Sequence, residues 1–220
     1  MLRPVLAVLI LLAGCRGHPD TSLAIAAAKG DITGMERLIE AGADVNAGNG
    51  AALVWAARTG AAASIPVLVS RGANPNLTNG VNSWTPLMHA IHKHQVAAVR
   101  ALLKAGANVE ARGGDGGTAL MMAAGYGYDD IVRVLLDGGA NPRVRGPDGL
   151  SALDLAVSGV PDIDRFTVGD CQGATILALI EHAPDLKLSG NQRVLRELEA
   201  LKLKGCAGAA QLEGRRFVSR

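Results

Sequence analysis

Apolar residues recur along the chain as two alternating kinds of triplet, both with the spacing i, i+3, i+4. Triplets of the first kind combine a leucine with small residues, and their leucines are Leu23, Leu53, Leu87, Leu120 and Leu153. A triplet of larger side chains follows each of them: Met35/Leu38/Ile39, Ile65/Leu68/Val69, Val99/Leu102/Leu103, Val132/Leu135/Leu136 and Ile176/Leu179/Ile180. This spacing places apolar side chains on one face of a helix. The pattern predicts two short amphipathic helices in each of five repeats.

The ends of these helices are also marked in the sequence. Gly42, Gly72, Gly106 and Gly139 each precede Ala-Asp or Ala-Asn after a second helix. Glycine adopts the left-handed backbone conformation that closes a helix without steric cost, and Asp or Asn suits the turn beyond it. Thr21 is predicted to cap the first helix. Alanine at paired positions in the first helices allows neighbouring helices to approach closely.

Two segments carry a family resemblance, residues 84–90 (WTPLMHA) and residues 115–120 (DGGTAL). With the Gly-Ala-Asp/Asn-x-Asn endings, they resemble the ankyrin repeat over residues 21–188. The resemblance implies an all-α solenoid of about five helix-turn-helix repeats with hairpin loops, hereafter fingers. We expect five stacked helix pairs, the first without a finger, and a role in binding proteins.

Departures from the repeat pattern mark three further features. Pro66 falls where a second helix is expected, so either Ser64 caps a helix that begins late or the helix is kinked. About eleven extra residues separate the helices of repeat five, and we expect a protruding loop near residues 159–169. An apolar stripe in residues 189–205 predicts a C-terminal capping helix, and residues 206–220 are expected to be a frayed tail.

The N-terminus has the pattern of an export signal. Arg3 precedes an apolar run of eight residues, and Leu12-Ala13-Gly14-Cys15 resembles the lipobox of bacterial lipoproteins. The resemblance implies that residues 1–14 are a signal peptide and that Cys15 carries the lipid. Residues 15–20 would be a short tether that holds the folded body close to the membrane. We expect a lipid anchor facing the periplasm, in the outer membrane more than the inner, because Arg16 and not Asp follows the cysteine.

Composition narrows the class of protein. The chain has 22 Lys and Arg against 20 Asp and Glu, and this near-balance argues against a nucleic-acid partner. Aromatic residues make up 3% of the chain, so the core must consist of aliphatic side chains. Once Cys15 carries lipid, Cys171 and Cys206 remain, and in an oxidising compartment they are a candidate disulfide. The alternative is two separate thiols.

Residue types suited to chemistry occur without the spacing that chemistry requires. His89, His92 and His94 suggest a metal site, but in the repeat pattern they occupy an inner helix, its end and a turn, so they need not converge. Asp162, Asp164 and Asp170 lack the pattern of a calcium loop. Serine nucleophile elbows, zinc-protease helices and Cys-x-x-Cys pairs are absent from the sequence. We therefore expect no metal, no cofactor and no enzymatic activity.

Two function classes remain. The first is a membrane-tethered module that holds or inhibits an unknown protein partner in the periplasm and is otherwise monomeric. The second is an enzyme or metal-binding protein that uses the loop of repeat five.

For the first class, the ankyrin pattern predicts a docking surface on the inner-helix ends and the fingers. These positions are Arg58, Asn82, Trp84, His92, Lys93, Asp115, Tyr126 and Leu150. Trp84 is the expected anchor, partly exposed, with Tyr126 and Lys93 as its rim, whereas Trp55 is expected in the core. The alternative is that Trp84 packs against the neighbouring finger and contributes stability alone.

Overall fold

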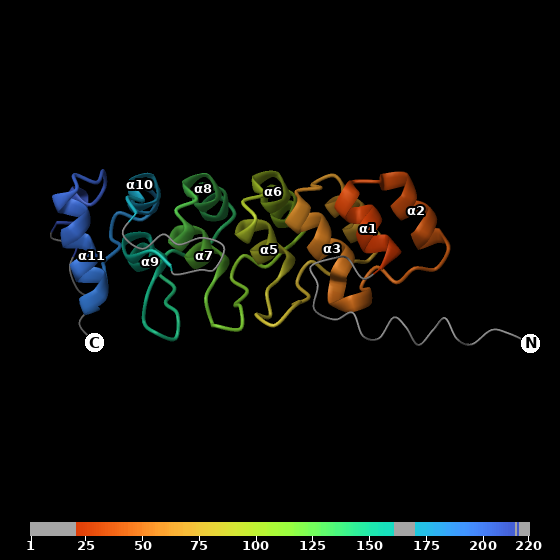
Figure 1. Ribbon diagram of the computed structural model, residues 1–220, viewed down its shortest axis with the longest axis horizontal. Coiled ribbons are helices and arrows are strands. Elements are labelled where there is room, and N and C mark those ends of the chain that lie inside the picture. Colours follow the sequence, from red (N-terminus) through yellow and green to blue (C-terminus); the bar gives the residue numbers. More distant parts are fainter. Residues whose placement is uncertain (1–20, 161–169, 214, 216–220) are drawn as a thin grey trace, which may run out of the picture.

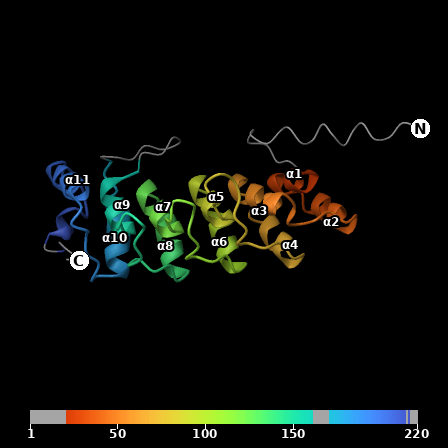
Figure 2. The same ribbon diagram turned by 90° about the horizontal axis from the view of Figure 1, so that it is seen from below.

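The fold follows from the repeated pairing of a small-residue helix with a helix of larger apolar residues. The structure is a computed structural model that describes residues 21–160, 170–213 and 215. The inner helices are α1 (Ser22–Lys29), α3 (Ala47–Thr59), α5 (Pro86–His92), α7 (Ala119–Tyr126) and α9 (Ala152–Ser158). The outer helices are α2 (Ile32–Glu40), α4 (Ser64–Ser70), α6 (Val96–Lys104), α8 (Asp129–Asp137) and α10 (Gly173–His182). Five helix pairs stand side by side in two rows (Figures 1 and 2), which confirms the expected solenoid.

The inner row approaches closely because its contact residues are small. Ala27, Ala57, Ala90, Ala124 and Ala156 are completely buried, and each inner helix contacts the next one along the chain. Larger aliphatic side chains fill the space between the inner row and the outer row of helices. The core is therefore one continuous layer along the stack, and each repeat buries its faces only against its neighbours.

The helix ends follow the sequence signals. Thr21, Thr85, Thr118 and Ser151 begin α1, α5, α7 and α9, and each side-chain oxygen accepts a hydrogen bond from the amide three residues on. Gly42, Gly72, Gly106 and Gly139 have positive φ angles just beyond the outer helices. In the second repeat α4 begins late, with Pro66 in its first turn. Ser64 does not cap it, because its hydroxyl donates to the carbonyl of Ala27 at 2.9 Å.

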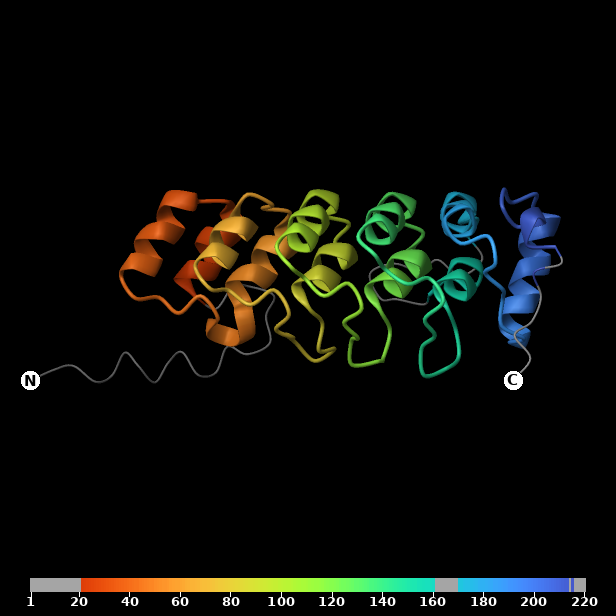
Figure 3. The same ribbon diagram turned by 180° about the vertical axis from the view of Figure 1, so that it is seen from behind.

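Fingers precede repeats three, four and five within the described residues. They span residues 79–84, 112–118 and 145–151, each closed by a pair of strand-like residues, and all three extend from the same side of the stack (Figure 3). In this described part of the chain, repeats one and two both lack a finger. This corrects the expectation that only repeat one lacks it. Gly48, Asn49 and Gly50 form a left-handed turn there, with φ angles of 60°, 55° and 76°. The shorter spacing of Leu23 and Leu53, 30 residues, leaves no length for a hairpin.

Asparagine side chains join successive repeats in the turns that follow the outer helices. Asn46 accepts from the amide of Asn74 at 2.9 Å and donates to the carbonyl of Gly72 at 3.0 Å. Asn76 makes the same two contacts one repeat further on, and Glu110 then accepts from the next repeat. These bonds satisfy backbone groups that the turns leave unpaired, and they fix the spacing of the repeats.

A capping helix closes the stack, as expected. Helix α11 (Gln192–Leu203) packs on α9 through Val194, Leu198 and Leu201. The residues after it do not fray at once, which is a correction. The short helix η1 (Ala210–Leu212) follows, and Cys206, Ala209 and Leu212 are buried. Apolar side chains and the disulfide hold this segment against α10 and α11.

The disulfide is the one that the sequence suggested. Cys171 and Cys206 are bonded, with their Cα atoms 5.6 Å apart. The bond joins the segment just before α10 to the turn after α11, so it ties the capping segment to repeat five. The loop predicted near residues 159–169 lies outside the described residues, apart from its first two positions.

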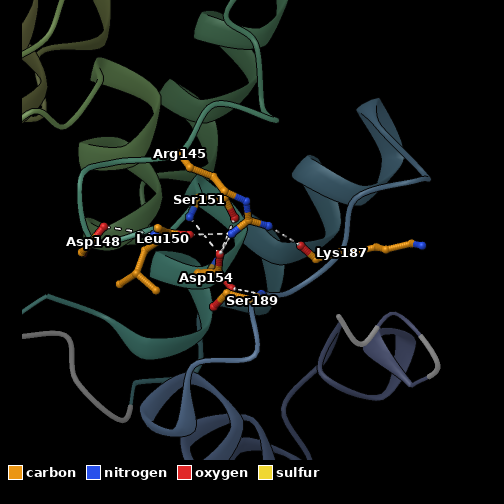
Figure 4. A network of polar contacts seen from close by, with 8 residues as sticks. Arg145, Asp148, Leu150, Ser151, Asp154, Lys187 and Ser189 are labelled. Carbon is orange, nitrogen blue, oxygen red and sulfur yellow. Dashed lines mark hydrogen bonds and ion pairs between the residues drawn. The ribbon is translucent and has the colours of Figure 1, made fainter. Parts of the chain in front are cut away.

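A buried carboxylate joins repeat five to the chain that leads into the cap (Figure 4). Asp154 is fully buried and accepts from the amide of Ser151 at 2.8 Å, from its hydroxyl at 2.7 Å and from the amide of Ser189 at 2.7 Å. Arg145, on the finger, forms an ion pair with it at 3.2 Å and also donates to the carbonyl of Lys187. A buried charge is tolerated only when its acceptor positions are filled in this way.

We expect Asp154→Asn to lower the free energy of unfolding by about 3 kcal/mol, because an amide would turn a donor toward groups that are themselves donors. Urea unfolding followed by circular dichroism measures the change. Asp148→Asn is the matched control, since Asp148 is exposed and its contact with the Leu150 amide can be kept by an asparagine. Equal unfolding midpoints for the two variants would contradict this account.

Candidate docking face

The exposed sides of the inner helices and the adjoining fingers form one face, here called the inner face (Figure 3). An open pocket of about 240 Å³ lies on it, between repeats three, four and five. Its walls are mainly apolar and come from α5, α7, α9 and the fingers: Trp84, Met88, Met121, Met122, Tyr126 and Leu155, together with Val160 and the polar residues Asp115 and Thr118. The pocket is thus a recess lined by side chains, in a face that is otherwise built from helix ends and turns.

Trp84 is held at the base of its finger by backbone hydrogen bonds, and a neighbouring glycine leaves space for its ring. Its amide and carbonyl both bond to Asn79, at 3.2 and 2.8 Å. A Cβ on Gly113 would lie 3.2 Å from the indole ring and 3.1 Å from the carboxylate of Asp115, closer than nearly all real contacts. The indole and the carboxylate therefore both border the space beside Gly113, and a side chain there would have to displace one of them.

A row of rings continues from Trp84 into the next repeat. The centroids of Trp84 and His92 are 5.0 Å apart, those of His92 and Tyr126 are 5.9 Å apart, and those of Tyr126 and Tyr128 are 5.5 Å apart. His92 Nδ1 lies 3.1 Å from the Tyr126 hydroxyl, and the tautomer of His92 decides which group donates. The rings connect α5 to α7 and fix the wall of the pocket.

The structure brings three of the predicted docking residues together at the pocket: Trp84, Asp115 and Tyr126. Trp84 is partly exposed, as expected. Tyr126 is not a rim residue, which is a correction: it is 3% exposed, because its ring packs among neighbouring rings and its hydroxyl contacts His92. Trp55 is only half-buried against the core, which corrects the expectation that it is a core residue, and the Arg58 guanidinium lies over its ring at 5.2 Å.

The other predicted residues are spread along the inner face. His92 adjoins the pocket through Trp84, and Lys93 ends α5, half-buried. Asn82 is exposed at the tip of a finger, and its carbonyl accepts from the amide of Gly114 in the next finger. Leu150 is half-buried in the last finger. Arg58 contacts His89 at 3.4 Å, further along the stack.

Sequence reasoning missed two parts of this face. Met88, Met121 and Met122 line the pocket, although in the sequence they look like ordinary residues of the inner helices. Val81 is 100% exposed at the tip of the first finger. An isolated β-branched residue in the turn Gly80-Val81-Asn82 is the signal that could have identified it.

The histidines do not converge on one ligand. His89 contacts Arg58, His92 contacts Tyr126, and His94 forms an ion pair with Asp130 at 3.0 Å. In the part of the chain that the structure describes, no three His, Cys, Asp or Glu side chains are placed to hold a metal ion. Asp162 and Asp164 lie outside the described residues, and Asp170 is exposed.

The comparisons with known proteins agree with this architecture. A sequence profile described as ankyrin repeats (3 copies) matches residues 23–113 and, in an overlapping match, residues 53–146. These two matches cover more than half of the chain. The chain belongs to the ankyrin-repeat family.

Individual relatives share the repeats. Cyclin-dependent kinase 4 inhibitor B of Rattus norvegicus is 32% identical over 117 residues, 52% of this chain and 90% of that protein. Its counterpart in Homo sapiens is 30% identical over 117 residues, 52% of this chain and 85% of that protein. Glycerophosphocholine phosphodiesterase gde1 of Schizosaccharomyces pombe is 36% identical over 97 residues, 43% of this chain and only 8% of that protein.

Burial of His89 makes the stability of this face depend on pH. Desolvation, with a further contribution from the nearby Arg58 cation, lowers the pKa of His89 from 6.5 to about 4. The neutral form is therefore favoured in the fold, and stability is lost as the pH falls from 6.5 toward 4. We expect the free energy of unfolding to fall over this range by about 2–3 kcal/mol more in the natural chain than in His89→Gln. Urea unfolding at a series of pH values measures this, and parallel curves for the two proteins would refute it.

Proposed function

We propose that this protein is a membrane-tethered binding module that holds or inhibits a protein partner in the periplasm of a bacterium. The observation that carries the proposal is the open apolar pocket on the inner face, with the fully exposed Val81 on the adjoining finger. Aromatic side chains in a recess surrounded by polar groups are typical anchors for a protein partner.

The relatives support an inhibitory or holding role. Two of them bear the name of a kinase inhibitor, and the aligned region covers 90% of the rat protein. The likeness is therefore to a protein made almost entirely of the shared region, in which no separate domain accounts for the inhibition. In this chain the same scaffold would act by covering part of its partner's surface.

The location rests on the N-terminal sequence and on the disulfide. Residues 1–20 lie outside the described part of the structure, so the lipid on Cys15 and the tether of residues 15–20 are proposals from the lipobox pattern. The Cys171–Cys206 bond supports export, since disulfides persist in oxidising compartments such as the periplasm. None of the helices in residues 21–160 and 170–213 has the length and apolar character to cross a bilayer. The proposed anchor is the lipid on Cys15, facing the periplasm, in the outer membrane more than the inner.

We expect Cys15→Ala to release the protein from the membrane, because acyl chains on this residue would supply the whole attachment. Fractionation of cells into membrane and soluble material, with detection of the full chain, measures the effect. Cys171→Ser, which removes the disulfide but leaves Cys15 in place, is the control and should leave the protein on the membrane. Membrane attachment of Cys15→Ala equal to that of the natural chain would remove the lipid anchor from the proposal.

The docking face is tested with a partner captured from native envelope extract and identified by mass spectrometry. Trp84→Ala should weaken its binding by about 2 kcal/mol, and Val81→Ser by about 1 kcal/mol, because both remove apolar contact area. Val81 is fully exposed, so its replacement leaves the fold intact. Leu203→Ser is the matched control, since Leu203 is 91% exposed on α11, away from the inner face. Equal affinities for all three variants and the natural chain would place the binding site elsewhere.

A further inference from the structure

The size of the inner-face pocket restricts what can occupy it. Its volume of about 240 Å³ is below the range of about 300–1,000 Å³ typical of small-molecule sites. The hollow suits one long side chain better than a whole ligand or a helix. Met88, Met121 and Met122 supply unbranched, polarisable walls that adapt to a flexible occupant.

One end of the pocket carries an unneutralised negative charge. Asp115 is exposed, and its Oδ1 accepts from the amide of Gly117 at 2.9 Å. No cationic side chain pairs with Asp115 among the described residues. Arg112, on the same finger, instead donates to the carbonyls of Gly116 and Arg145, at 2.6 and 3.3 Å. Within the described residues the carboxylate therefore has no cation partner, and it faces the open side of the molecule.

An aromatic ring lies beside this carboxylate. The Trp84 indole and Asp115 both line the pocket, and both border the space at Gly113 where a side chain would be, so they lie close to one another. A tryptophan ring attracts a cation through its negative faces, and a carboxylate attracts it directly. An apolar channel that ends in these two groups matches the side chain of lysine or arginine, in which a methylene stem carries a terminal cation.

We propose that the pocket binds a lysine or arginine side chain of the protein partner. The methylene stem lies against the methionines, and the cation lies between Trp84 and Asp115. This assignment rests on the proposed docking role of the inner face and adds the chemistry of the residue that docks there. It also gives Gly113 a purpose, since a side chain at that position would separate the two groups that recognise the cation.

The test compares two small probes that differ only in the terminal ammonium group, N-acetyl-lysine-N-methylamide and N-acetyl-norleucine-N-methylamide. The full chain carries Trp55→Phe, so that Trp84 is its only tryptophan, and the fluorescence of Trp84 reports binding at constant ionic strength. We expect the lysine probe to bind about fivefold or more tightly than the norleucine probe. Asp115→Asn should abolish that preference. Asp148→Asn, which changes an exposed finger carboxylate outside the pocket, should keep it.

Three results would overturn the assignment: equal or tighter binding of the norleucine probe, a preference that survives Asp115→Asn, or no binding of either probe. Tighter binding of norleucine would leave the pocket as an apolar docking site and remove only the cation. Conversely, a lysine preference together with unchanged partner affinity in Trp84→Ala and Val81→Ser would keep the cation pocket and refute the proposed docking face. The two proposals therefore fail in distinguishable ways.

Discussion

The close approach of neighbouring inner helices is the constraint on which the structure depends. Completely buried alanines at the contacts allow the inner helices to pack side by side, and four of them have only seven or eight residues and would be unstable alone. A larger side chain at any of these positions would separate two repeats, and with them the fingers that they position. The low aromatic content agrees with the same requirement, because bulky rings do not fit at these alanine contacts.

A stack of this kind exposes apolar surface at its last repeat unless something covers it. Here three devices act together at the C-terminal end: helix α11 on α9, the Asp154 network that reaches the backbone of Ser189, and the disulfide after α11. Each one connects repeat five to a different part of the capping segment. The cap is consequently tied to the repeats by apolar contact, by a buried charge and by a covalent bond.

The regular part of the fold could be predicted from the sequence because its signals are local. Helix periodicity, the capping threonines and the helix-ending glycines depend on a few adjacent residues, and the structure confirms them. The missing finger of repeat two could have been anticipated from the short first spacing, but the left-handed turn at Gly48–Gly50 that replaces it could not, because the turn is held by Asn79 of the neighbouring finger. Residues 206–213 are folded because they contact helices that are distant in the sequence, and local sequence patterns do not predict such contacts.

The candidate site was predictable in position but not in detail. The repeat register placed Trp84 and Asp115 on one face, and the pocket does include both. Tyr126 was misjudged because its burial depends on rings from two repeats. The methionine walls arise from residues that look like ordinary core in sequence. What makes the site distinctive is the space that Gly113 leaves, and space is a property of the packed structure.

The central claim is that the partner covers the inner face. Hydrogen–deuterium exchange of the full chain, with and without the captured partner, tests it most directly because it reports on every segment at once. The account predicts slower exchange in the fingers at residues 79–84 and 112–118 and at the start of α7, with the outer helices α4, α6 and α8 unchanged. Protection confined to the outer helices, with the fingers unaffected, would contradict it.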